Sequence, residues 1–388
     1  MQIDPGEAIR RALRAEKAAT AIADPERRQL AIATAQWLQG EAALRIDRED
    51  RAAGLIDSAL ATVVRLEPGS VLHGEILLSR GGVHGTRGEL ASALADYQAA
   101  HNIFRKLGDL RNRAKALMLI ATLYSDGNDS MSSLKYLSQA LEVYRGDPGM
   151  LVAIYNNRAS NFQDLGRYDE AEAQYRKALA LAEQMKSSLL QSRIQGNIAR
   201  VLLKAHKTAA AAQAIAASQR LAKASEAAVW QVQLLPIAAA VALQQGDLPR
   251  ALALISQRFA GVDLTKTGLS SREGHLAAYA IYKALDRPVD ALVHLEAQKR
   301  LDDQATAIAT DVSTALLAAR FDFANQELKI SKLRADELER SVRYEQDQAK
   351  TERLMFIGAI AAVSIIIGLL ALGLVTISPQ SRQGARRE

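Results

Sequence analysis

Apolar and small residues recur every three or four positions through most of the chain, which is the spacing of one face of an α-helix. The pattern is clearest over residues 151–186, where it is interrupted once, at Asp164-Leu165-Gly166. The residues on this face are Ile154, Tyr155, Ala159 and Phe162 before the break and Ala171, Tyr175, Ala178 and Leu181 after it. This stretch therefore predicts two amphipathic helices joined by a short turn, with Gly166 ending the first helix.

Small and large residues alternate along these two helices in the way that close antiparallel packing requires. The positions that carry this alternation are Ala159, Gly166, Tyr168, Ala171, Tyr175 and Ala178. In this order and spacing they resemble the tetratricopeptide repeat. The stretch departs from that repeat in having Tyr155 where a Trp is usual and in lacking a proline near its end. The resemblance implies a superhelix whose first helices line a concave groove for extended peptides or helices.

The small residue of the second helix recurs along the chain at a period of forty residues, or thirty-eight between Ser133 and Ala171. The full series is Ala53, Ala93, Ser133, Ala171, Ala211, Ala251 and Ala291. The turn position repeats in step, as Gly88, Asn128, Gly166, His206, Gly246 and Asp286. We therefore predict an all-α fold, a tetratricopeptide-type α-solenoid of about seven helical hairpins over residues 1–300.

Extending this period to the start of the chain makes Gly6–Ile22 a second helix without a first. Met1–Asp4 has no basic segment followed by an apolar core, so no secretory signal is visible. Two interpretations stay open: the protein faces the cytoplasm, or an upstream part is missing. Within the array, Pro236 falls inside a helical pattern and predicts a kink or an early helix start.

After the repeats, no Gly or Pro occurs from Val289 to Ile357, which permits one long helix. Within it a seven-residue spacing places Phe321, Leu328, Ala335, Val342 and Ala349 on one seam. Such a seam predicts a coiled-coil stalk over residues 301–353 that pairs two chains in parallel. A solitary charged stalk helix is the alternative, because Ser331 and Glu345 interrupt the second line of the seam.

Leu354–Ile377 contains no charged residue and is long enough for a helix to cross the hydrocarbon core of a bilayer. We predict a single transmembrane helix there, followed by a short basic tail at residues 378–388. The number of basic residues on the two sides does not decide the orientation.

The sequence argues against several classes of chemistry. The absence of Cys excludes thiolate catalysis and sulfur-ligated metals, and the six His residues lack a metal-ligand spacing. The glycine-rich stretch 81–88 lacks Gly-Lys-Ser/Thr and falls where the repeat needs close helix approach, so a phosphate loop is disfavoured. The net charge of +6 is spread along the chain. We expect no enzyme activity, no metal, no cofactor and no nucleic-acid partner.

Polar residues in the predicted groove are the candidates for partner binding. Asn157 and Asn197 lie forty residues apart at equivalent positions, and each amide offers a donor and an acceptor to a peptide backbone. Arg193 and Arg200 flank Asn197 and could contact a carboxylate or phosphate. The alternative is that all four are ordinary solvated polar residues.

The order of parts resembles the sensory half of bacterial membrane receptors whose output is a diguanylate cyclase or a histidine kinase. The specific match is the Arg320-Phe321-Asp322 segment and the stalk, and no output domain follows the predicted span. The resemblance implies a ligand-sensing, protein- or peptide-binding module, single-pass in the bacterial inner membrane. The alternative is a tail-anchored scaffold whose array faces the cytoplasm and assembles a membrane complex.

Overall fold

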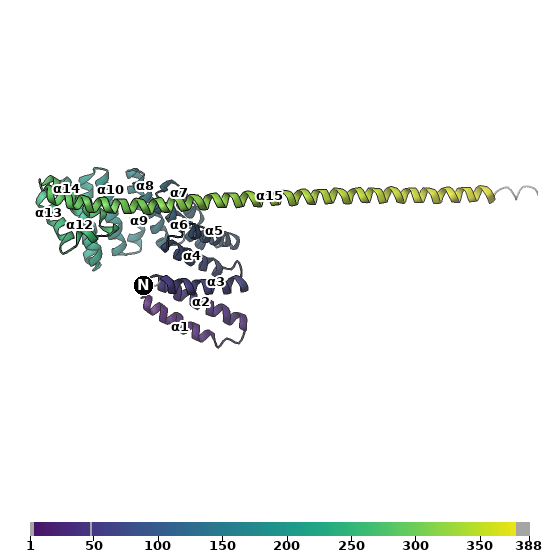
Figure 1. Cartoon of the computed structure of the whole chain (residues 1–388), viewed down its shortest axis with the longest axis horizontal. Coiled ribbons are helices and arrows are strands. Elements are labelled where there is room, and N and C mark those ends of the chain that lie inside the picture. The colour runs from purple at the N-terminus through teal and green to yellow at the C-terminus, as the bar shows by residue number, and fades with distance from the viewer. Residues whose placement is uncertain (1–3, 47–48, 378–388) are drawn as a thin grey trace, which may run out of the picture. The chain divides into compact units, whose positions relative to one another are not determined.

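A computed structural model describes residues 4–46 and 49–377, with side chains described at all of these except 49, 319–337 and 373–377. The regular secondary structure of this part consists of helices, with no strand among the described residues (Figure 1). The α-helices are α1 (Pro5–Ala19), α2 (Pro25–Leu44), α3 (Glu49–Leu66), α4 (Val71–Thr86), α5 (Leu90–Leu107), α6 (Leu110–Asp126), α7 (Ser130–Val143), α8 (Pro148–Asp164), α9 (Tyr168–Gln184), α10 (Ser188–Lys204), α11 (Thr208–Ala224), α12 (Ala228–Gln244), α13 (Leu248–Phe259), α14 (Arg272–Ala284) and α15 (Pro288–Ile377). Two short 3₁₀-helices, η1 (Leu264–Lys266) and η2 (Leu269–Ser271), precede α14.

The helices pair in the predicted order as antiparallel hairpins. Each even-numbered helix from α2 to α14 is the first helix of a hairpin and the next helix is the second, which gives seven hairpins. The helix α1 is left over at the start and packs on α2 as a second helix does. The all-α solenoid predicted from the period is therefore confirmed.

Backbone conformation at the turns explains why the period is so regular. All six residues of the predicted turn series adopt a left-handed conformation, with φ between 54° at Asp286 and 79° at Gly246. Three of them are not glycine, and Asn and Asp tolerate this region better than most residues. A left-handed residue ends the first helix and lets the chain reverse within two or three positions.

The small residues of the second helices are buried where the hairpins cross. All seven members of the series are between 0% and 8% exposed. Large residues fill the wider gaps beside them, such as Tyr97 and Tyr175, which are 5% and 3% exposed. Pro236 lies inside α12 and is buried, so the helix does not start there. The early start was a wrong alternative.

The last helix begins as the second helix of the seventh hairpin and then continues. Contacts divide the chain into two compact units, of which the first ends at Ala319 and so includes the start of α15. Buried residues continue along this part of the helix as far as Val312 and Leu316. A Cβ on Gly127, which follows α6, would lie 3.1 Å from Val312 Cγ1 and 3.3 Å from Leu316 Cδ1. The seventh hairpin thus reaches back to the third through α15.

The second unit contains the rest of α15, and its described side chains from 338 to 372 are exposed. One stretch of the described chain, Leu338–Leu372, contains a segment long and apolar enough to cross a membrane, with a mean hydropathy of 2.7 over an 18-residue window. It includes most of the predicted span, whereas the predicted tail at 378–388 lies outside the described residues. We treat the uncharged part of this stretch, Leu354–Leu372, as the candidate membrane span, and the charged residues before it belong to the stalk.

Candidate functional site

A polar pocket of about 200 Å³ lies where α6, α7 and the facing side of α8 meet. Its lining consists of hydroxyl, amide and carboxyl side chains, with no apolar residue: Thr122, Ser125, Asp126, Ser133, Asn156, Asn157, Ser160 and Asn161. Such a lining is unusual between helices that otherwise pack through Ala, Leu and Val. This pocket, called here the α6–α8 pocket, is the candidate site.

Two of its lining residues are almost fully buried, since Ser133 and Asn161 are each 1% exposed. In the described part of the chain, neither Ser133 Oγ nor Asn161 Oδ1 has a hydrogen-bond partner. The amide nitrogen of Asn161 is used, because Nδ2 donates to the backbone oxygen of Asn157 at 2.8 Å. An unpartnered buried polar atom is costly, so both atoms mark a place where a partner would be stabilising.

A carboxylate completes the pocket at its rim. Asp126 is the last residue of α6, and incomplete hydration of its carboxyl raises its pKa, although the residue as a whole remains exposed. The C-terminal end of a helix carries partial negative charge and disfavours a carboxylate further. Within the described residues, Asp126 forms no ion pair. A positive charge in the pocket would relieve this unfavourable arrangement.

Of the residues predicted from the sequence, Asn157 lines this pocket directly. Asn197 does not line the pocket but contacts a residue that does. Its Nδ2 donates to Oδ1 of Asn156 at 3.0 Å, and Asn156 lines the pocket. The two predicted amides are therefore joined through Asn156. Asn197 is already hydrogen-bonded on both sides, since its Oδ1 accepts from Arg200 Nη1 at 2.8 Å.

The two predicted arginines differ in their contacts: Arg200 forms an ion pair, and Arg193 lies near an aromatic ring. Arg200 forms a two-point ion pair with Glu273 of α14, at 2.7 Å from Nε and 3.0 Å from Nη2. Burial alone would lower the pKa of Arg200, but the ion pair outweighs burial and raises it. Arg193 is exposed, with its guanidinium carbon 5.9 Å from the ring centre of Trp230. A partner carboxylate would compete with Glu273 for Arg200.

A second, more open pocket of about 420 Å³ adjoins this ion pair. It is lined by Arg200, Lys204, Leu269, Ser270, Arg272, Glu273, Leu276 and Gln298. Its charges are largely used internally, because Arg272 also pairs with Asp302. This pocket is therefore a gap between hairpins whose lining side chains mostly bond to one another.

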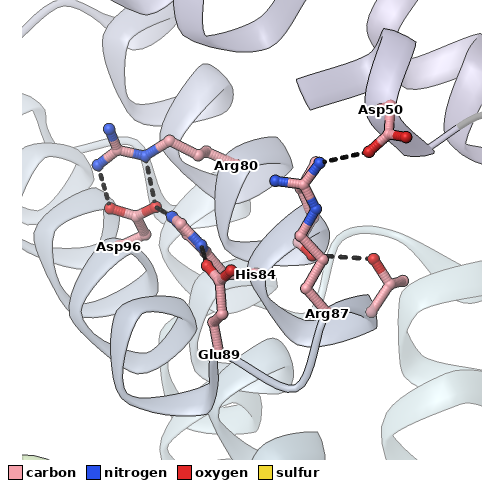
Figure 2. Close-up of polar contacts among 8 residues, drawn as sticks. Asp50, Arg80, His84, Arg87, Glu89 and Asp96 are labelled. Carbon is pink, nitrogen blue, oxygen red and sulfur yellow. Dashed lines mark hydrogen bonds and ion pairs between the residues drawn. The ribbon is translucent and has the colours of Figure 1, made fainter. Parts of the chain in front are cut away.

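The glycine-rich stretch 81–88 forms the end of α4 and the following turn, so it is no phosphate loop. A Cβ on Gly81 would lie 2.4 Å from Tyr97 Cε1, which explains the glycine by close helix approach. Figure 2 shows the polar side chains here paired with one another: Arg80 donates to Asp96 at 2.7 and 2.6 Å, and His84 lies between Asp96 and Glu89. Arg87 reaches Asp50 at 3.0 Å. The pairs of Arg80 and His84 lie within the second hairpin, and the pair of Arg87 with Asp50 joins it to α3 of the first.

Two other histidines form a buried pair within the seventh hairpin, His275 on α14 and His294 on α15. His275 Nδ1 and His294 Nδ1 are 2.9 Å apart, and His275 Nε2 is 2.9 Å from Thr267 Oγ1. Burial, together with the nearby His294, Arg300 and Arg258, lowers the pKa of His275 to about 4. Both rings are therefore neutral near pH 7. Among the described residues, no group of three or more His, Asp or Glu is placed to hold a metal ion.

Comparison with known proteins agrees with this architecture. Residues 151–224 match the family model described as tetratricopeptide repeat. The array is a tetratricopeptide-like solenoid. The apo form of RapI is similar at a TM-score of 0.58 and 14% identity, covering 83% of this chain and 98% of that one. A Rap protein complexed with competence and sporulation factor is similar at 0.54 and 16%, covering 76% and 80%.

A tetratricopeptide repeat protein from Parabacteroides merdae is similar at a TM-score of 0.51 and 15% identity, covering 73% of this chain and 98% of that one. No protein with curated annotation matches the sequence. At these identities the similarity concerns the fold. Arrays of this kind are typically non-catalytic and mediate contacts between proteins.

Of the eight residues that line the pocket, sequence reasoning predicted only Asn157, and the seven that it missed include Asp126, Ser133 and Asn161. Ser133 occupies the small position of the repeat series, and its hydroxyl has no role in that pattern. A usable signal was present, because Ser133 is the single polar member of a series that is otherwise alanine.

Proposed function

We propose that this protein is a membrane-anchored module that binds a protein or peptide through its solenoid and acts in signalling, as a sensor. The observation that carries the proposal is the α6–α8 pocket, a polar site with unused hydrogen-bonding atoms in a fold that mediates protein contacts. A Rap protein of the same fold has been crystallised with competence and sporulation factor, so the fold accommodates a bound factor.

The position of the pocket supports a sensing role over a purely adhesive one. Ser125 and Asp126 of the pocket directly precede Gly127. A Cβ added to Gly127 would lie against Val312 and Leu316 of α15, so the end of α6 packs closely on that helix. The same helix continues to Ile377 and contains the candidate span. A bound partner that shifts the end of α6 would therefore act on a helix that extends to the membrane, provided that the two states differ in affinity for it.

Selection of peptides tests the binding function. The full chain in lipid nanodiscs is exposed to a phage-displayed library of random peptides, with empty nanodiscs as control. We expect enrichment of peptides whose binding is weakened by Asn157→Ala, because Asn157 lines the pocket, whereas Asn197 is held by internal hydrogen bonds. Recovery of no peptide above the empty nanodiscs would contradict the proposal.

Orientation distinguishes the sensor from the tail-anchored scaffold. The chain contains no Cys, so a single Lys223→Cys, at an exposed position of α11, reports where the array lies. A membrane-impermeant maleimide added to bacterial spheroplasts labels this residue if the array lies outside the cytoplasm, as the sensor requires. Labelling only after lysis would favour the scaffold.

We also propose that the stalk pairs two chains through its predicted seam. Val342 and Ala349 are exposed in the single chain, as seam residues without a partner would be, while the side chains of Phe321, Leu328 and Ala335 lie outside those described. Single-cysteine variants in membranes test this. Val342→Cys should crosslink between chains and Glu339→Cys poorly, and equal yields would leave a solitary stalk helix.

A further inference from the structure

The α6–α8 pocket is built at two positions where the other repeats are apolar. At the position of Ser133, every other repeat has alanine, and the nearest equivalents, Ala93 and Ala171, are 0% exposed. A serine here adds one hydroxyl to a helix crossing that alanine fills. In the described part of the chain this hydroxyl bonds to nothing, so it does not stabilise the crossing.

Asn161 is the second departure from the repeat pattern. Its equivalents in the other hairpins are buried and apolar: Val83, Leu123, Val201, Val241 and Ile281. An asparagine at such a position loses the hydrophobic contribution of the valine or leucine and buries an amide instead. The packing of the solenoid therefore accounts for neither residue.

These two departures come from neighbouring hairpins and converge on one cavity. The described chain has four buried side-chain atoms without a hydrogen-bond partner, at Ser133, Asn161, Gln163 and Gln298, and the first two line the same pocket. Two independent costs at one place favour a bound group that offsets them both.

The polar atoms in the pocket determine which hydrogen bonds and which charge a bound group must provide. Asn161 Oδ1 is an acceptor, because the nitrogen of the same amide already donates to Asn157. Ser133 Oγ can accept as well, and the carboxylate of Asp126 accepts and carries a negative charge. A ligand that fits must therefore donate several hydrogen bonds and be positively charged.

We propose that the α6–α8 pocket binds the guanidinium group of an arginine side chain in a protein or peptide partner. The inference rests on the proposed binding function and specifies the partner. A planar guanidinium presents five donors and always carries its charge, so one group can satisfy Ser133, Asn161 and Asp126 together. A volume of about 200 Å³ is smaller than that of typical small-molecule sites and suits one side chain.

Binding of a minimal probe tests this directly. The full chain in detergent micelles is titrated with Nα-acetyl-arginine amide and, separately, with Nα-acetyl-citrulline amide, which has nearly the same shape without the charge. Ligand-observed NMR measures the two affinities. We expect saturable binding of the arginine probe in the millimolar range and at least tenfold weaker binding of the citrulline probe.

Matched variants locate the binding. Asp126→Asn should weaken the arginine probe at least tenfold, and Asn161→Val should abolish its binding. Asp164→Asn is the control, because Asp164 ends α8 at the position equivalent to Asp126, its pKa is likewise raised by burial, and it does not line the pocket. This control should leave the affinity unchanged. Thermal melts verify that each variant is folded.

Several results would overturn the inference: no saturable binding of the arginine probe, equal binding of the citrulline probe, or equal losses in Asp126→Asn and Asp164→Asn. Failure here is separable from failure of the proposed function, because peptides selected by the nanodisc experiment would still bind, without a requirement for arginine.

Discussion

Two of the places where the described solenoid buries serine residues, at Ser192 and at Ser133, differ in whether the hydroxyls are used. Ser192 and Ser218 are both 0% exposed, and each hydroxyl donates to the other's backbone oxygen, at 2.8 and 2.7 Å. Trp230 Nε1 adds a further bond to Ser192 Oγ at 2.9 Å. Ser133 is buried to the same degree and has no partner among the described residues.

The closed cluster at Ser192 and the open one at Ser133 show that burial of a polar residue does not by itself mark a site. A satisfied hydroxyl contributes modestly to stability, whereas an unsatisfied one costs free energy and gains from any ligand that completes it. The distinction lies in the partners, which only the structure supplies. The predictions that follow test this difference, from the largest expected effect to the smallest.

Overpacking should distinguish a filled crossing from one with a cavity beside it. Ala171→Leu adds volume at a fully buried crossing and should lower the free energy of unfolding by up to about 3 kcal/mol. Ser133→Leu at the equivalent crossing should cost less, because the leucine can extend into the adjoining pocket. Melting temperatures of the full chain in detergent compare the two, and equal losses would mean that the pocket provides no room.

The fold was predictable because the same pattern of small and turn residues repeats along the sequence. The small residue and the left-handed turn recur at fixed spacing, so each hairpin supplies an independent copy of the same packing instruction. Ala171 and Gly166 alone suggest little, but their equivalents in the neighbouring repeats fix the register. The continuation of α15 against Gly127 was not predictable, because a contact between the third and the seventh hairpin leaves no mark on a local period.

The site was predictable only in part for a related reason. Asn157 was predicted because a polar residue on a first helix is visible in the pattern, and it lines the candidate pocket, although its role in binding stays a prediction. Asn197 and Arg200 share that pattern, yet internal partners occupy them, and the sequence does not show a bond to Glu273. Hydrogen-bond partners that lie in other repeats decide which polar residues remain available.

Protonation provides a second test of a closed polar pair. His275 and His294 are buried and neutral, and the pKa of His275 is lowered to about 4. Between pH 6.5 and 4, His275 is therefore protonated in the unfolded chain and neutral in the folded chain. Stability is complete above pH 6.5 and falls as the pH decreases, by about 2 kcal/mol between pH 7.5 and 5.

The control for this pH dependence is the variant His275→Gln, which can keep hydrogen bonds without titrating. Asp126 and Asp164 act in the opposite direction, because carboxyls with raised pKa values make the folded chain bind protons more readily. The slope that His275→Gln removes is therefore the contribution of the histidine. Melting temperatures that are equally pH-dependent in both proteins would contradict the assignment.

Removal of one hydroxyl should affect the two serine clusters differently. Ser192→Ala leaves the indole N–H of Trp230 without its acceptor and should cost about 1–2 kcal/mol of unfolding free energy. Ser133→Ala removes a group that bonds to nothing among the described residues and restores the alanine of the other repeats, so stability should stay the same or rise. Denaturant titration of both variants measures the contrast, which equal losses would erase.

The smallest effect should be a gain. Asn161→Val installs the residue that Val201 and Val241 provide at the same place in later hairpins, and it removes an unpartnered buried amide oxygen. The free energy of unfolding should rise by about 1 kcal/mol or less, because new apolar burial is partly offset by the cavity that the valine does not fill. Asn197→Val is the matched control: its amide bonds to Asn156 and Arg200, so its replacement should destabilise the chain. If both variants lost stability to the same extent, Asn161 would be a structural residue, and the open cluster would be as closed as that at Ser192.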